Sequence, residues 1–175
     1  MRSLSFNARK PLKIILDEWC SGAKPDPVFQ RNIAAHEAGH ALIASLCNVK
    51  PLGAIVYGEG NSEGAYGEVF LDPADFHPLA ARDRFSILCA GAIATVVAGA
   101  EHPDDGMYFG ATGDMEAIHE IIDVCGYDQD EVRAIAQEVT SCLRAFKGEL
   151  LKLTEALVSS RFVSADEIRR IVAVA

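Results

Sequence analysis

Apolar residues recur at spacings of three and four over residues 130–159, the pattern of a helix that buries one face. Together with start signals and with segments rich in alanine and other apolar residues, this pattern predicts five helices, over residues 28–47, 80–100, 114–124, 130–159 and 164–172. Two of these helices have start signals in the sequence. Asp26 and Pro27 suit an N-cap and a first helical position, and Ser164 with Glu167 forms a capping-box pattern.

Residues 50–72 have a different character, because glycines there separate short runs of β-branched and aromatic residues. Two strands are expected, over residues 54–57 and 67–71, with a loop over residues 58–64 between them. A second loop, over residues 72–78, contains two prolines and leads into the next helix. The sequence therefore predicts a mainly α fold with a small β-sheet insertion, an α+β class.

The chain has 175 residues, which is close to the usual size of one domain. We expect residues 26–175 to form a single domain, preceded by a loosely organised N-terminal lead-in over residues 1–25. The uncharged stretch 85–100 is shorter than the roughly 18 residues of a membrane span and is rich in alanine and glycine. It is expected to be a buried core helix, with no membrane insertion.

The charge balance narrows the classes of partner. The chain carries 16 Lys and Arg against 25 Asp and Glu, a formal net charge of −9 at pH 7. An acidic chain of this kind is not expected to bind nucleic acid or anionic membranes. Its five cysteines are widely spaced without a CxxC pair, and no signal-peptide pattern is visible, so reduced thiols in the cytoplasm are expected.

One short motif carries a chemical signal. His36-Glu37-Ala38-Gly39-His40 has the form HExxH and lies within the first predicted helix. Histidines four residues apart share one helix face, so both imidazoles can bind one metal ion, and Glu37 projects beside them as a potential general base. Zinc is the usual metal for such a site. Gly39 weakens the helix, so close approach of another helix or a substrate backbone is expected there. The alternative is an exposed helix face with two histidines by chance.

A catalytic zinc needs a third protein ligand. The extended motif HExxHxxGxxH is absent, because Ile43 and Leu46 occupy its last two positions, so the ligand must come from later in the chain. The candidate carboxylates are Glu68, Asp72, Asp83, Glu101, Asp104, Asp105, Asp114, Glu116 and Glu120. Asp114 and Glu116 are favoured, since each can start a helix that faces the first. The alternative is that an acidic residue in the first turn only stabilises the helix through a favourable interaction with the helix dipole.

Several segments in this order resemble a known family. They are His-Glu-Ala-Gly-His-Ala-Leu at 36–42, the Gly-rich strand pair, the Ala/Gly-rich helix, and Gly-Ala-Thr-Gly-Asp-Met-Glu-Ala at 110–117. Together they resemble the peptidase domain of the FtsH family (peptidase family M41), over about residues 30–172. The resemblance implies a zincin-like helical fold and a zinc-dependent endopeptidase with one Zn²⁺ per chain.

The resemblance also assigns the site residues. It implies that His36, His40 and Asp114 hold the zinc ion and that Glu37 is the general base. Glu116 and Glu120 are the fallback ligands. FtsH proteases also carry an AAA ATPase domain and transmembrane helices, whereas this sequence contains no P-loop motif GxxxxGK[ST].

Without that domain, activity is expected to be independent of ATP and limited to unfolded polypeptides or peptides. A separate unfoldase, or a homo-oligomer of the chain, is a candidate partner. Two alternatives stay open. One is a catalytically silent, peptidase-like module that keeps the metal site and serves binding or regulation. The other is a helical domain without metal, in which the HExxH match is accidental.

The strand 67–71 has two interpretations. Zinc peptidases often hold substrate as an added strand at a sheet edge, so Gly67, Glu68 and Val69 are candidate substrate-binding residues. The alternative is an ordinary hairpin with a flexible turn. The remaining histidines, His77, His102 and His119, are expected at the surface.

Overall fold

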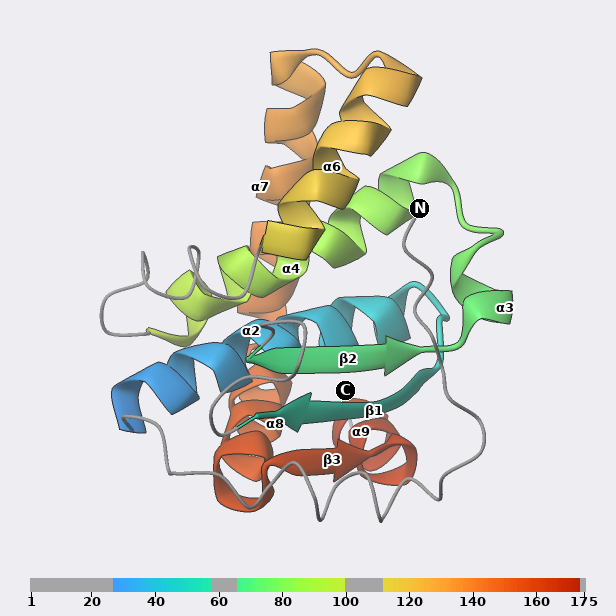
Figure 1. The fold of residues 1–175 in the computed structure, drawn as a ribbon. Helices are drawn as coiled ribbons and strands as arrows, with labels where there is room; N and C mark the ends of the chain where they lie inside the picture. The colour runs from blue at the N-terminus through green and yellow to red at the C-terminus, as the bar shows by residue number, and fades with distance from the viewer. Residues whose placement is uncertain (1–26, 58–65, 100–111, 174–175) are drawn as a thin grey trace.

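The computed structural model describes residues 27–57, 66–99 and 112–173. In chain order the described elements are α2 (Pro27–Leu46), β1 (Pro51–Val56), β2 (Gly67–Leu71), α3 (Pro73–Phe76), α4 (Ala81–Ala98), α6 (Thr112–Cys125), α7 (Gln129–Ala145), α8 (Lys147–Ser160), β3 (Phe162–Ser164) and α9 (Ala165–Val172). Helices dominate and one small antiparallel sheet accompanies them, which confirms the predicted α+β class (Figure 1). The predicted lead-in and the loop 58–64 lie outside the described residues.

The sheet has the order β2-β1-β3, with β1 antiparallel to both neighbours. Ala54 of β1 lies opposite Val69 of β2 and Val163 of β3. β1 is almost entirely buried, whereas every residue of β2 is half-buried. Among the residues described, β2 pairs with β1 alone, so it is an edge strand of the sheet.

Helix α2 is the centre of the fold. Every residue from Asn32 to Ala44 is buried, because α4, α8 and the sheet all pack against this helix. Figure 1 shows α2 behind the strands, with α4 above the sheet and α6 and α7 extending away from it. A helix that is covered on all sides needs small and apolar residues around its whole circumference. The alanines of this segment meet that requirement.

The C-terminal half corrects one prediction. Residues 130–159 were expected to form one continuous helix, but the structure divides them into α7 and α8 at Phe146, whose φ and ψ of −101° and 29° are not helical. The physical reason is a change of packing partner. α7 packs mainly against α4, whereas α8 packs mainly against α2. Uninterrupted apolar spacing cannot reveal that the two halves of the pattern face different neighbours.

Two short elements were not predicted. Strand β3 follows α8 directly, and α3 lies inside the predicted loop 72–78, where Asp72 caps it by accepting a hydrogen bond from the Ala74 amide (2.9 Å). The last helix begins as expected, with the Ser164 hydroxyl accepting a hydrogen bond from the Glu167 amide (3.3 Å). The described part of the apolar stretch after residue 85 lies in α4, which buries one face in the core and leaves residues such as Val96 exposed. No helix in the described ranges is both long and apolar enough to cross a membrane.

Candidate metal centre

Three side chains from two distant segments meet at one point. His36 and His40 lie one turn apart in the buried part of α2, and Asp114 lies in the first turn of α6. Asp114 Oδ2 is 3.1 Å from the Nε2 atom of His36 and 3.1 Å from that of His40. All three ligand atoms lie within 4.8 Å of one another, so the group could hold a metal ion. Tetrahedral zinc with bonds of about 2.0–2.1 Å separates its ligand atoms by about 3.3 Å, which fits this spacing.

A carbonyl group of α4 fixes the orientation of one imidazole. His40 Nδ1 donates a hydrogen bond to the carbonyl oxygen of Ile87 (2.7 Å) in the buried interior. This bond leaves Nε2 directed at the metal position, the usual arrangement of a metal-binding histidine. The corresponding Nδ1 atom of His36 is buried without a hydrogen-bond partner in the described part of the protein.

A glycine of α4 leaves space beside the two imidazoles. A Cβ atom built on Gly91 would overlap with the Nε2 atoms of both His36 and His40. Any other residue at this position would therefore intrude on the ligand atoms. Gly39 has a related role between the helices, because its own Cβ would overlap with the Ala90 carbonyl and the Ala94 side chain of α4. The close helix approach that was predicted at Gly39 is confirmed.

Glu37 lies between the ligands and the sheet. Its side chain is buried, with the residue 4% exposed, and it packs against the backbone of β2 at Gly67. A Cβ atom at Gly67 would overlap with the Glu37 carboxyl group, so the glycine makes space for that side chain. The neighbouring residue Glu68 accepts a hydrogen bond from the Tyr57 hydroxyl (2.8 Å), and Val69 packs against the core.

The electrostatics of the cluster follow from burial and from mutual contact. Burial alone lowers the pKa of His40, but the Asp114 carboxylate reverses that effect and raises the pKa to about 9. Burial is also the largest influence on His36 and lowers its pKa, although the Asp114 carboxylate can accept a hydrogen bond from this imidazole. Burial raises the pKa of Asp114, yet the two histidines outweigh it and hold that pKa well below its usual range. The carboxylate is thus an anion, as a cation ligand must be.

The general-base candidate has the opposite shift. Burial raises the pKa of Glu37 to about 8, while the charge of His40 acts against this effect and the carboxylates of Asp114 and Glu68 add to it. In a site that holds a divalent cation, the positive charge favours the ionised carboxylate. A pKa in this region suits a group that takes up and releases one proton near neutral pH.

The other predicted ligands do not join the cluster. Glu116 and Glu120 are exposed on α6, and Asp72 caps α3. The exposed residues His77 and His119 agree with the prediction of surface histidines. The candidates Glu101, Asp104, Asp105 and His102 lie outside the described residues. Sequence reasoning did not single out Gly91 or the Ile87 carbonyl, although a glycine in the middle of a helix was an available signal.

Comparison with known proteins adds no family to this picture. Neither the models of known protein families nor the curated proteins include a match to the sequence. The geometry of the site is therefore the basis on which a function is assigned.

Proposed function

We propose that the protein is a zinc-dependent endopeptidase of the FtsH type, which hydrolyses peptide bonds in unfolded polypeptides or peptides without ATP. The observation that carries the proposal is the meeting of His36, His40 and Asp114 around one point, with Glu37 buried directly beside the two histidines. Two imidazoles and one carboxylate form a three-ligand zinc site that leaves a position for substrate or water.

The residues have separate roles in this proposal. His36, His40 and Asp114 would hold the ion, which supplies Lewis acidity toward a carbonyl oxygen and toward water. Glu37 accepts a proton from the attacking water at its carboxylate and delivers it to the amine that leaves. The Ile87 carbonyl keeps His40 in the orientation and tautomer that present Nε2 to the site.

The edge strand β2 is the proposed substrate platform. Its first residue, Gly67, lies against Glu37, and its pairing partner among the described residues is β1 alone. An extended peptide that adds to the outer side of β2 through backbone hydrogen bonds would pass beside the general base. Gly67 and Val69 would then contribute outward-facing backbone groups to binding, whereas the backbone groups of Glu68 face Ile55 of β1.

The test combines metal content with turnover. Protein purified without chelator should contain about one zinc ion per chain by mass spectrometry, and His36→Ala should abolish it, since the site loses one of three ligands. His119→Ala is the matched control, because it removes an exposed histidine of α6 and should leave metal content unchanged. Glu37→Gln should keep the metal but lower cleavage of unfolded casein by at least about 100-fold.

The outcomes separate the candidate functions. Full activity of Glu37→Gln would show that the proposed mechanism is wrong. Bound zinc without any cleavage, even at high protein concentration, would instead indicate a peptidase-like module that binds or regulates. Absence of metal after zinc is added back would remove both and leave a helical domain.

A further inference from the structure

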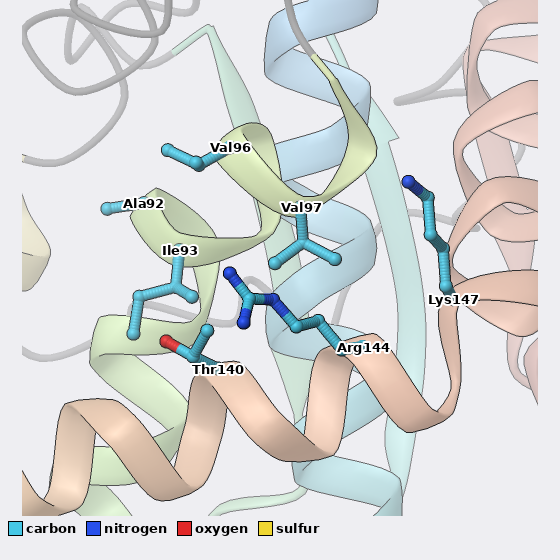
Figure 2. Close-up of a pocket in the computed structure, with 7 residues that line it drawn as sticks. All are labelled: Ala92, Ile93, Val96, Val97, Thr140, Arg144 and Lys147. Atoms are coloured by element: carbon cyan, nitrogen blue, oxygen red, sulfur yellow. The ribbon is translucent and has the colours of Figure 1, made fainter.

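A groove lies on the side of α4 that faces α7 and α8, separate from the candidate metal centre. It is a groove of about 480 Å³ between the C-terminal half of α4 and the junction of α7 and α8. Its lining residues are Ala92, Ile93, Val96, Val97, Thr140, Arg144 and Lys147 (Figure 2). The volume lies within the range of small-molecule sites, about 300–1,000 Å³.

The groove has an apolar wall and a basic wall. α4 contributes the apolar wall, and Val96 on it is 58% exposed. Figure 2 shows the Arg144 side chain extending across the groove toward Ile93 and Val97, with Lys147 at the other end. The Thr140 hydroxyl already donates to the Ala136 carbonyl oxygen (2.7 Å), which leaves the two cations as the main polar groups of the groove.

The basic residues of the described chain differ in whether a carboxylate pairs with them. Arg31, Arg82, Arg133 and Arg169 each form an ion pair with a carboxylate. Neither Arg144 nor Lys147 forms a hydrogen bond or an ion pair through its side chain within the described part of the chain. In a chain with a net charge of −9, two unpaired cations beside exposed aliphatic side chains form a local site for an anion that also carries an apolar group.

We propose that this groove binds a linear aliphatic carboxylate, of the fatty-acid class. Its carboxylate would bind the Arg144 guanidinium, and its alkyl chain would lie along the apolar wall that Ile93, Val96 and Val97 form. A planar guanidinium binds a carboxylate through two parallel hydrogen bonds, and the ammonium of Lys147 adds a second charge. The net charge favours this small monoanion over an acidic protein partner, which the whole surface would repel at long range.

Calorimetric titration of the full chain with dodecanoate, below its critical micelle concentration, tests the proposal. Each buried methylene group should tighten binding by up to about fourfold, so octanoate should bind more weakly than decanoate, and decanoate more weakly than dodecanoate. Dodecanol, which has the same chain without the charge, should bind at least about tenfold more weakly than dodecanoate.

Variants locate the site. Arg144→Glu combined with Lys147→Glu should abolish binding, and Val96→Asp should weaken it at least about tenfold, because it places an anion on the apolar wall. Lys152→Glu, an exposed residue of α8 outside the groove, makes the same type of charge change and should bind as the wild type does. Circular dichroism melts verify that each variant is folded.

Three results would overturn the proposal: no heat of binding for dodecanoate, equal binding of dodecanol, or dodecanoate affinity unchanged in the double variant. A soluble amphipathic peptide rich in glutamate and leucine provides the contrasting probe. If it bound with the same variant dependence while dodecanoate did not bind, the groove would be a peptide-docking surface instead.

Discussion

Gly91→Ala is the sharpest single perturbation of the proposed site. The added Cβ would overlap with the Nε2 atoms of His36 and His40, so both imidazoles would have to move away from the position they share with Asp114. Changes in the shell around a metal site typically lower affinity by about 10–100-fold, and this overlap affects the ligand atoms directly. We therefore expect a loss of about 100-fold in zinc affinity, equivalent to about 2.7 kcal/mol.

Thermal unfolding with and without zinc measures this loss. At a free zinc concentration 100 times the wild-type Kd, binding should stabilise the wild type by about 2.7 kcal/mol and Gly91→Ala by about 0.4 kcal/mol. For a chain of this length, these values correspond to Tm increases of about 5–11 °C and about 1–2 °C. Gly148→Ala in α8 is the matched control, because a Cβ there meets nothing within 4 Å. If Gly91→Ala and Gly148→Ala showed the same zinc-induced rise in Tm as the wild type, Gly91 would not border a metal site.

Two further predictions concern the protein without metal. The pKa values of His40 and Glu37 are raised from 6.5 to about 9 and from 4.5 to about 8, so the folded state holds these protons more tightly than the unfolded state does. In chelator, the free energy of unfolding in urea should therefore fall as the pH rises from about 7 to 9, whereas below about pH 6.5 the lowered pKa of His36 acts in the opposite direction. Glu37→Gln should show a smaller fall up to pH 8. Asp128→Ala should lower the free energy of unfolding by about 1 kcal/mol, because it removes the capping box of α7. Asp130→Ala, which loses only an exposed ion pair with Arg133, should change it by less than about 0.5 kcal/mol.

The parts of the site that depend on local spacing could be predicted from the sequence. His36 and His40 face the same way because a helix places residues i and i+4 on one side, and the start signal at Asp26 and Pro27 predicted a helix here. The third ligand is different, because its position depends on how α6 packs against α4. From the residues alone Asp114 was one of nine candidates, and the structure brings it to the histidines while Glu116 and Glu120 remain exposed.

The elements that were missed depend on contacts between distant segments. β3 is three residues long, and its identity as a strand comes from its pairing with β1, far earlier in the chain. Likewise, the break at Phe146 reflects the different neighbours of α7 and α8, and the Ile87 carbonyl matters only because α4 lies against His40. None of these features leaves a periodic signal in its own segment.

The glycines between α2 and α4 favour a metal site over a chance HExxH match. Each glycine inside a helix costs about 1 kcal/mol relative to alanine, and both helices contain one at their contact. Gly39 allows the backbone of α4 to approach α2. Because Gly91 has no Cβ atom, the space beside the two Nε2 atoms then stays open. Tight helix packing alone would explain Gly39, but Gly91 is opposite imidazole nitrogens rather than a backbone. A pair of histidines with only a structural role could pack against alanine at a slightly greater helix separation, and would need no such gap.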